Sequence, residues 1–517
     1  MPSVRATLVS NLHQNQQTVA VFPSSTVRKE DIFKLAKNKL GIKRPGRIFT
    51  ADGAELTESS GSDAFIDVAN GMTLLVSTEV GFIGAIKEAE SGPPASTAGP
   101  SARVLSLAVS TDQDSIDQLH LSARLPSMRL VAAMPDLHAG SRRHPVGAAF
   151  VSAGRIFPAL VGGDIGCGML LLRTRLDAGA NVDRMAVKMR GIGVPEGLEG
   201  EWTHGCEAWK RHCGFEDFTL SPSAEEAGSS AIDTQRFDRS LGTIGAGNHF
   251  AELTVIEEVV DETLFAQLGL DYNRLLLLVH SGSRGLGAAV LDATEPELDT
   301  HGSLNADSEQ ARTYLRRQED AIRWAKANRM LIAHRVLAVM GERAYDDSPE
   351  TLLPERQILD ICHNRVDRVS EDEAAVLGLG GEGEGSSLWI HRKGAAPSTE
   401  GLVVIPGSRG TLSYVVQPIG DGRASALSLA HGAGRSLSRH KAHALMSRRY
   451  NEESRIATLL ERTPLGGRVI CEDRALLYEE APEAYKDAGA VVKALEEAGA
   501  VKVVMKLRPM VTYKCTR

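Results

Sequence analysis

A run of small residues and prolines near the N-terminal end divides this chain in two. Glu88–Val104 reads EAESGPPASTAGPSARV, which offers almost nothing to bury and has the composition of a linker. One hydrophobic core that continues from the residues before this stretch to those after it is therefore excluded. We expect a small module at 1–85, a flexible linker at 86–103 and one large domain at 104–517.

The N-terminal module has the pattern of one helix covering one sheet. Runs rich in β-forming residues lie at Val4–Val9, Thr18–Phe22, Arg47–Thr50 and Met72–Ser77. Between them, Ser25–Thr26 can cap a helix in which apolar residues recur at helical spacing, namely Ile32, Leu35, Ala36 and Leu40. The order β-β-α-β-β resembles the ubiquitin-like, or β-grasp, superfold. Because it carries no catalytic motif, we interpret it as a docking or solubility module whose ligand the sequence leaves open.

Strand and helix patterns mix along the large domain, which indicates an α/β fold. Leu275–His280 is predicted to be a buried strand and Tyr314–Val339 a long helix. Glu371–Ser387 (EDEAAVLGLGGEGEGSS) is acidic and rich in glycine, so we expect a mobile surface loop there.

Charge and cysteine usage narrow the class of protein. The formal net charge is −8, which argues against a general nucleic-acid coat protein. Two segments are nevertheless basic, Ala311–Arg329 and Arg435–Arg449, and such helical runs are usually solvated faces. No apolar run approaches the roughly 20 residues that cross a bilayer, and the N-terminus lacks a signal pattern. With six Cys in no framework spacing, we expect an intracellular, cytoplasmic protein without disulfides.

Several short phrases combine histidine with glycine or polar residues. They contain six of the 15 His: His138, His249, His280, His363, His391 and His431. Asp164 and Cys167 stand in GGDIGCGM. A carboxylate, a thiolate and imidazoles together suit Mn, Zn or Fe, whereas the paired C-x-x-C spacing of a structural zinc site is absent. A catalytic metal site and a buried, inert Cys167 are both compatible with this spacing.

Basic residues beside glycine-rich turns indicate a phosphate-rich ligand. These residues are Arg284, Arg392, Lys393, Arg409, Arg435 and Arg439. His431, in HGAGR, is the best candidate nucleophile, because an imidazole can attack phosphorus and form a phosphoramidate. Such a histidine needs a partner for its other nitrogen, and Asp136 in MPDLH is our candidate.

The order of these motifs resembles the RtcB family of RNA ligases. The motifs are MPDLHAG, GGDIGCGM, GTIGAGNHFAEL, HSGSRGLG, CHNR, HRKGAA, IPGSRGTLSY and HGAGRSLSR. The resemblance implies the RtcB-type α/β catalytic fold and a ligase that depends on GTP and Mn²⁺. Such an enzyme joins RNA 3′-phosphate or 2′,3′-cyclic phosphate ends to 5′-hydroxyl ends through a histidine-GMP intermediate, in tRNA splicing or RNA repair. A monomer is the expectation for this family, and the resemblance leaves open whether an archease-type activating partner is needed.

The resemblance carries the family's functional residues onto this chain. Two Mn²⁺ ions are expected on Asp164, Cys167, His249, His280 and His363, with Cys167 as the bridge. His431 is the guanylylated residue, oriented by Asp136. Nucleotide contacts are expected from Asn248, Glu252, His363, Asn364, Pro406, Gly407, Ser408, Ser413, His431, Gly432, Ala433, Gly434, Arg435 and Lys514. RNA or phosphate contacts are expected from Arg284, Arg392, Lys393, Arg409 and Arg439. Arg409 departs from the family pattern, since it stands in Gly-Ser-Arg-Gly where Gly-Ser-Met-Gly is usual.

Two other classes of function stay open at this point. One is a metal-dependent phosphoesterase or nucleotidyltransferase that processes nucleic-acid ends without sealing them, which has no need of GMP on His431. The other is a non-catalytic RNA-binding protein that is related to these enzymes. Such a protein would have no need of the predicted metal ligands. Covalently bound GMP would distinguish the ligase from the end-processing enzyme. Bound metal would distinguish both of these enzymes from the non-catalytic protein.

Overall fold

The computed structural model describes residues 4–515 apart from 12–16, 41, 43–44, 51–53, 57–64, 79–101, 141–142, 192–236, 238–239, 343–354, 380–385 and 451–460. The chain divides into two compact units, Met1–Thr97 and Ala98–Arg517. The predicted linker at 86–103 lies outside the described residues, except for 102 and 103. In the part of the chain that the structure describes, no helix is long and apolar enough to cross a membrane.

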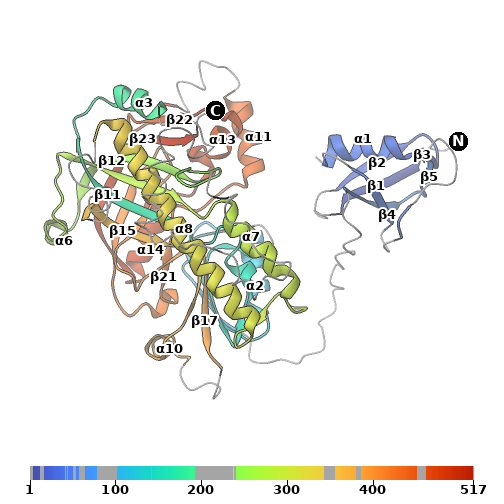
Figure 1. The fold of residues 1–517 in the computed structure, drawn as a ribbon, viewed down its shortest axis with the longest axis horizontal. Helices are drawn as coiled ribbons and strands as arrows, with labels where there is room; N and C mark the ends of the chain where they lie inside the picture. Colours follow the sequence, from blue (N-terminus) through green and yellow to red (C-terminus); the bar gives the residue numbers. More distant parts are fainter. Residues whose placement is uncertain are drawn as a thin grey trace, which may run out of the picture. The chain divides into compact units, whose positions relative to one another are not determined.

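The N-terminal unit is a mixed sheet covered by one helix (Figure 1). Its strand order is β2 (Gln17–Phe22), β1 (Val4–Ser10), β6 (Met72–Ser77), β4 (Arg47–Thr50), and the central pair β1 and β6 is parallel. Helix α1 (Lys29–Leu40) buries Ile32, Ala36 and Leu40, in a core shared with Leu8, Ile48 and Leu74. Apolar residues at helical spacing thus face residues that alternate along the strands. The result is the predicted β-grasp arrangement.

The start of α1 differs from the prediction. Thr26 does not cap the helix but opens a short strand, β3 (Thr26–Arg28), which pairs with β5 (Phe65–Asp67). Its hydroxyl donates to Asp67 Oδ1 at 3.0 Å. The predicted cap at Ser25–Thr26 is therefore wrong, because a partner strand distant in sequence takes the hydroxyl that a local cap would have used.

Two sheets form the framework of the larger unit. The first has the order β15 (Gln357–Cys362), β11 (Gly168–Asp177), β13 (Arg274–Ser281), β12 (Phe250–Val259), β23 (Val501–Cys515), β20 (Ser413–Pro418), β19 (Val403–Ile405), with β22 (Arg468–Cys471) parallel to β23. The second has the order β16 (Asn364–Arg368), β17 (Leu388–Lys393), β9 (Val146–Ala153), β8 (Met128–His138), β7 (Arg103–Ser106). Two short pairs complete the strands, β10 (Arg155–Ile156) with β14 (Leu304–Asn305), and β18 (Ala395–Pro397) with β21 (Ser428–Ala430).

The described helices of this unit are α2 (Gln113–Ala123), α3 (Val182–Arg190), α6 (Glu262–Gln267), α7 (Gly285–Thr294), α8 (Glu309–Met340), α10 (Glu371–Leu377), α11 (Arg439–Arg449), α13 (Arg474–Glu479) and α14 (Ala488–Glu497). Figure 1 shows α8, in yellow, running across the first sheet.

Side-chain alternation along the strands sets the layers of this unit. In β13, Leu275, Leu277 and Val279 pack in one cluster with α8. Leu276 and Leu278 point the opposite way, into a cluster between the two sheets that includes Leu130 and Met134 of β8. The intervening Val131 and Ala133 pack with Leu119 of α2. The layers are therefore α8, first sheet, second sheet and α2, and the predicted strand at Leu275–His280 is confirmed within one residue at either end.

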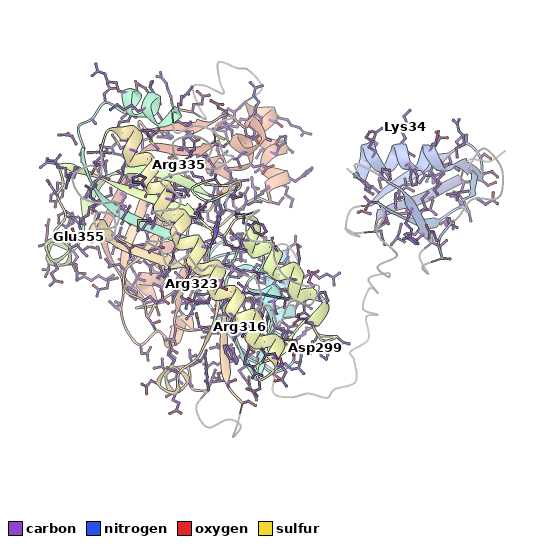
Figure 2. The ribbon with its side chains drawn as sticks, viewed as in Figure 1. Lys34, Asp299, Arg316, Arg323, Arg335 and Glu355 are labelled. Atoms are coloured by element: carbon purple, nitrogen blue, oxygen red, sulfur yellow. The ribbon has the colours of Figure 1, made fainter. Side chains whose placement is uncertain are left out.

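Helix α8 confirms the predicted long helix and extends it at the N-terminal side. It begins after Ser308, whose side chain accepts from the backbone N–H of Ala311, and ends at Gly341 in the left-handed conformation. Its exposed arginines include Arg316 and Arg323, labelled in Figure 2. Arg323 pairs with Asp320 one turn away. The outer part of this basic segment is thus a solvated face, as its composition indicates.

The acidic segment Glu371–Ser387 is only partly a loop. Its first seven residues form α10, which Ser370 and Glu373 close with a reciprocal capping box. The expectation of a loop there is wrong, because acidic residues in the first turn of a helix are stabilising. Residues 380–385 of the segment lie outside the described part of the chain.

Candidate active site

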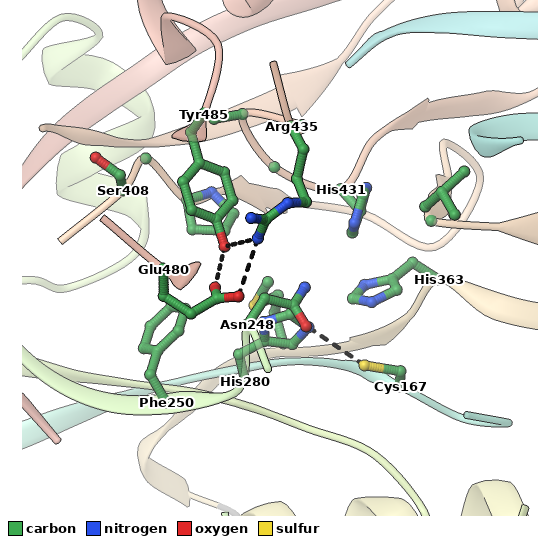
Figure 3. Close-up of a pocket in the computed structure, with 18 of the residues that line it drawn as sticks. Cys167, Asn248, Phe250, His280, His363, Ser408, His431, Arg435, Glu480 and Tyr485 are labelled. Atoms are coloured by element: carbon green, nitrogen blue, oxygen red, sulfur yellow. Dashed lines mark hydrogen bonds and ion pairs between the residues drawn. The ribbon is translucent and has the colours of Figure 1, made fainter. Parts of the chain in front are cut away.

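A cavity of about 220 Å³ lies on the inter-sheet side of the first sheet. Successive side chains along a strand point to opposite faces of the sheet, and this alternation decides which residues line the cavity. His280 follows Leu276 and Leu278 at even spacing, and His363 follows Leu359 and Ile361 in the same way. On β23, Val511 and Tyr513 pack toward α8, so Thr512 and Lys514 face the cavity. The hydrophobic pattern that builds the core thus also delivers these polar side chains to one place (Figure 3).

A cluster of potential metal ligands occupies one side of the cavity. The ligand atoms of Cys167, His249 and His280 all lie within 4.8 Å of one another. The Cys167 sulfur is 3.3 Å from His249 Nε2 and 3.2 Å from His280 Nε2. Asp164 Oδ2 is 2.9 Å from His249 Nε2. The rings of His280 and His363 lie 5.2 Å apart between centroids. The structure therefore gathers all five sequence-predicted ligands around one space.

The protonation states of this cluster suit a cation. Burial lowers the pKa of His280 and His363 well below the usual value, so both imidazoles are neutral, as ligation requires. His249 Nδ1 lies 3.1 Å from the carbonyl of Ile244, which leaves Nε2 for a ligand. Burial and the neighbouring Asp164 raise the pKa of the Cys167 thiol. A divalent cation reverses that preference, so the donor set fits a metal such as Mn, Zn or Fe.

His431 is oriented by a buried carboxylate. It follows β21, and its Nδ1 donates to Asp136 Oδ2 at 2.6 Å. The backbone N–H of His431 donates to the same oxygen at 3.3 Å. Asp136 is fully buried within β8. The pair fixes the tautomer of His431 and leaves Nε2 with its lone pair, which is the state that a nucleophilic imidazole needs.

Two glycines make the close approaches in this site possible. Gly434 has φ +71°, and a Cβ there would lie 2.2 Å from the carbonyl oxygen of Asp136. A Cβ on Gly282 would lie 2.1 Å from Asp164 Oδ1. Any side chain at either position would displace one of the two carboxylates, so the glycine-rich phrases serve the packing of the site.

Comparison with known proteins identifies the family. The sequence model described as "tRNA-splicing ligase RtcB" matches residues 118–515. The chain belongs to the RtcB family. It is 42% identical over 400 residues to RNA-splicing ligase RtcB2 of Escherichia coli, a match that covers 77% of this chain and 91% of that protein. It is 32% identical over 460 residues to tRNA-splicing ligase RtcB of Nanoarchaeum equitans, with 77% and 92% covered.

The residues that the RtcB resemblance assigns to the nucleotide nearly all line the cavity. Those that do are Asn248, Glu252, His363, Asn364, Pro406, Gly407, Ser408, His431, Gly432, Ala433, Gly434, Arg435 and Lys514. Ser413 is set back from the lining, and its hydroxyl accepts from the backbone N–H of Gly407 at 3.2 Å. Burial raises the pKa of Glu252 to about 7, although Thr512 donates a hydrogen bond to it.

The predicted phosphate contacts fall into two groups. Lys393, Arg409 and Arg439 line the cavity. Arg409 Nη2 donates to the carbonyl of Leu477, and its Nη1 is buried without a hydrogen-bond partner among the described residues. A buried donor left in this state is a sign of a missing acceptor. Arg409 is one of the positions at which this chain departs from the expected RtcB pattern.

Arg392 and Arg284 do not line this cavity. The buried Arg392 guanidinium donates to Asp367 at 2.7 Å and to Ser428 at 3.0 Å. Neighbouring residues on a strand point to opposite faces, so β17 directs Lys393 and not Arg392 to this cavity. The phosphate role of Arg392 stays a prediction. Arg284 donates to Thr243 and lines a smaller cavity behind His249.

Sequence reasoning missed a buried group opposite His431. Glu480 accepts from Arg435 Nη1 at 2.9 Å and from the hydroxyl of Tyr485, and Lys514 Nζ lies 3.9 Å from it. Figure 3 shows Glu480, Tyr485 and Arg435 joined in this way. Neither Tyr485 nor Glu480 lies in one of the motifs that the sequence analysis singled out.

Proposed function

We propose that this protein is an RNA ligase that uses GTP to join an RNA 3′-phosphate or 2′,3′-cyclic phosphate end to a 5′-hydroxyl end, in tRNA splicing or RNA repair. Membership of the RtcB family supports the ligase reaction, and the matched relatives are named as RNA- and tRNA-splicing ligases. The observation that carries the proposal is the His431–Asp136 pair, which opens into the same cavity as the cluster of Cys167, His249 and His280.

The proposed reaction begins on His431. Its Nε2 attacks the α-phosphorus of GTP, so a P–N bond forms and the bond to pyrophosphate breaks. Asp136 accepts the Nδ1 proton in a hydrogen bond and stabilises the positive charge that develops on the ring. An oxygen of the RNA 3′-phosphate then takes the GMP from His431, which gives an activated RNA-ppG end. Finally, the 5′-hydroxyl attacks the 3′-phosphorus, the RNA phosphodiester forms and GMP leaves.

Two Mn²⁺ ions would be held by Asp164, Cys167, His249, His280 and His363. Bound Mn²⁺ offsets the negative charge of phosphates and orients their oxygens. Unlike a structural zinc site, this set has a single thiolate and opens into a cavity.

The charged lining supports a guanine nucleotide and a polyanion as ligands. The guanine base presents N–H donors, and the carboxylate of Glu252 is suited to accept them. Arg435 and Arg409 can approach phosphate oxygens from the loops around His431. Arg439 opens α11 with its side chain 57% exposed. A longer RNA would leave the cavity past Arg439 and continue along α11, which has no acidic residue.

Labelling with α-³²P-GTP and Mn²⁺ tests the proposal. Wild-type protein should acquire an acid-labile, alkali-stable label, and His431→Ala should acquire none. His120→Ala, an exposed histidine on α2, is the matched control and should label normally. An RNA with the two proposed ends then reports sealing, with and without an archease-type activator.

Other outcomes would point to the competing functions. A folded, metal-loaded protein that never labels, even with the activator, but removes terminal phosphates would be an end-processing phosphoesterase. A folded protein that binds RNA but neither metal nor GTP would be a non-catalytic relative. Either result would contradict the ligase proposal.

A further inference from the structure

Two cysteine side chains meet beside the nucleotide cavity. Cys471 ends β22 and Cys515 ends β23, and the two residues are register partners in this parallel pair. Their sulfur atoms lie 3.8 Å apart. Both thiols are free in this structure. The reaction proposed above uses neither of them.

The backbone already holds this pair at a distance that a disulfide can span. Neighbouring strands lie about 4.8 Å apart, and the Cα atoms of disulfide-bonded cysteines are usually about 4.4–6.8 Å apart. The two sulfur atoms, 3.8 Å apart, therefore have only about 1.8 Å to close before they reach the usual S–S bond length. Of the other described cysteines, Cys167 belongs to the cluster of potential metal ligands and Cys362 lies next to Arg329.

The two thiols differ in the way that a reactive pair requires. Cys471 is buried, whereas Cys515 is partly exposed. The contact between the two sulfur atoms lowers the pKa of Cys515 to about 6 and raises the pKa of Cys471. The more accessible sulfur is therefore also the one that more readily becomes a thiolate, the nucleophilic form.

We propose that Cys471 and Cys515 are a thiol–disulfide modification site, which a hydroperoxide closes and a dithiol reopens. The Cys515 thiolate attacks the peroxide, so an S–O bond forms, the O–O bond breaks and an alcohol or water leaves. The Cys471 sulfur then attacks Cys515, so the S–S bond forms, the S–O bond breaks and water leaves. The two thiols lose two electrons in total, and the peroxide gains them.

This bond would fix the end of β23 where β23 meets the cavity. Lys514 directly precedes Cys515, and its Nζ donates to the carbonyl of His249 at 3.2 Å. On the other side, Cys471 leads through α13 to Glu480, which contacts Arg435. The disulfide would close a loop around these groups, so the oxidised protein should resist unfolding more strongly than the reduced protein.

Peptide mapping of the full-length protein tests the proposal. Wild-type protein is treated with hydrogen peroxide, alkylated with N-ethylmaleimide and digested with trypsin without reductant. We expect a dithiothreitol-sensitive species that joins Val469–Arg474 to Cys515–Arg517, with the mass of two peptides less two hydrogens. Cys471→Ser and Cys515→Ser should each lack this species. Thermal unfolding should give a higher midpoint for oxidised than for reduced wild type, and no such difference for the variants.

Three results would overturn the proposal. The first is oxidised wild type in which both peptides carry N-ethylmaleimide. The second is Cys515 converted to sulfinic acid while Cys471 stays free. The third is a disulfide that joins Cys515 to another cysteine or to a second chain. Because the readout is the state of two thiols, it is independent of whether the protein ligates RNA.

Discussion

Nδ1 of His431 lies 2.6 Å from Oδ2 of Asp136, although 295 residues separate them in the sequence. Asp136 lies near the C-terminal end of β8, and His431 is the residue that follows β21. The contact therefore exists only when the second sheet and the β18–β21 pair are assembled. The orientation of this predicted nucleophile is thus a property of the whole unit and not of a local motif.

The Asp136–His431 contact predicts the effect of Asp136→Asn. The amide cannot keep Nδ1 protonated as a carboxylate does, and it gives no charge to stabilise the imidazolium. We expect the rate of GMP labelling to fall by about a thousandfold or more, with the fold intact by circular dichroism. Labelling at the wild-type rate would show that Asp136 does not orient His431.

The cluster around Cys167 predicts a loss of metal in two variants. Cys167→Ala and His280→Ala each remove a buried ligand, so the affinity for Mn²⁺ should fall by at least about tenfold. Electron paramagnetic resonance of bound and free Mn²⁺ measures this without reference to activity. Cys471→Ser replaces a buried thiol outside the cluster and should bind Mn²⁺ as wild type does. Equal affinities in all four proteins would exclude the cluster as the metal site.

Burial of Glu252 predicts a pH dependence of stability. Its pKa is raised to about 7 in the folded protein, whereas an unfolded glutamate titrates near about 4.3. Between these values the folded state binds the extra proton, so the free energy of unfolding falls as the pH rises. Glu252→Gln cannot titrate and should lose this component, which amounts to at most about 4 kcal/mol. Urea unfolding of both proteins at pH 5 and pH 7.5 measures the difference, and parallel pH profiles would contradict the assignment.

Arg329 predicts a large loss of stability on substitution. It is fully buried on α8, its Nη1 donates to the carbonyls of Gly166 and Ser281 beside two predicted metal ligands, and it pairs with Asp360. Arg329→Met leaves that carboxylate buried and unpaired, which should cost about 3–5 kcal/mol. Arg323→Met, on the exposed face of the same helix, should cost under about 0.5 kcal/mol. Similar urea midpoints for the two variants would refute this.

The separate cores of the two units predict a tolerated truncation. The described core of the N-terminal unit contains residues of that unit alone, and the clusters around the cavity contain none of them. A protein that starts at residue 98 should therefore keep the unfolding midpoint of the larger unit and the rate of GMP labelling. A drop in either would show that the N-terminal unit supports the site.

Much of this molecule could be predicted from periodicity and motifs. Strand β4, strand β6 and the core of α8 follow directly from their apolar patterns. The segment at Glu371 shows the limit, because its acidic composition suggests a loop until Ser370 and Glu373 are considered together as a capping box. Local composition and local hydrogen bonding pointed in opposite directions there, and hydrogen bonding decided the structure.

The direction of side chains was harder to predict than their chemistry. Arg392 and Lys393 share one basic phrase, yet only Lys393 can face the cavity once the phrase becomes a strand. Glu480 belongs to no motif and reaches the site only because α13 packs against α11 and β22. Its place depends on tertiary packing, which has no signature in the residues around it.

Strand β23 has a consequence for the time at which activity can arise during synthesis. It lies in the middle of the first sheet, between β12 and β20, and supplies Thr512 and Lys514 to the cavity. A ribosome makes β12 some hundreds of residues earlier, so a nascent chain must hold an incomplete sheet open until position 514 has left the exit tunnel. Until then the cavity lacks one wall, so we expect a nascent chain to be inactive on RNA near the ribosome.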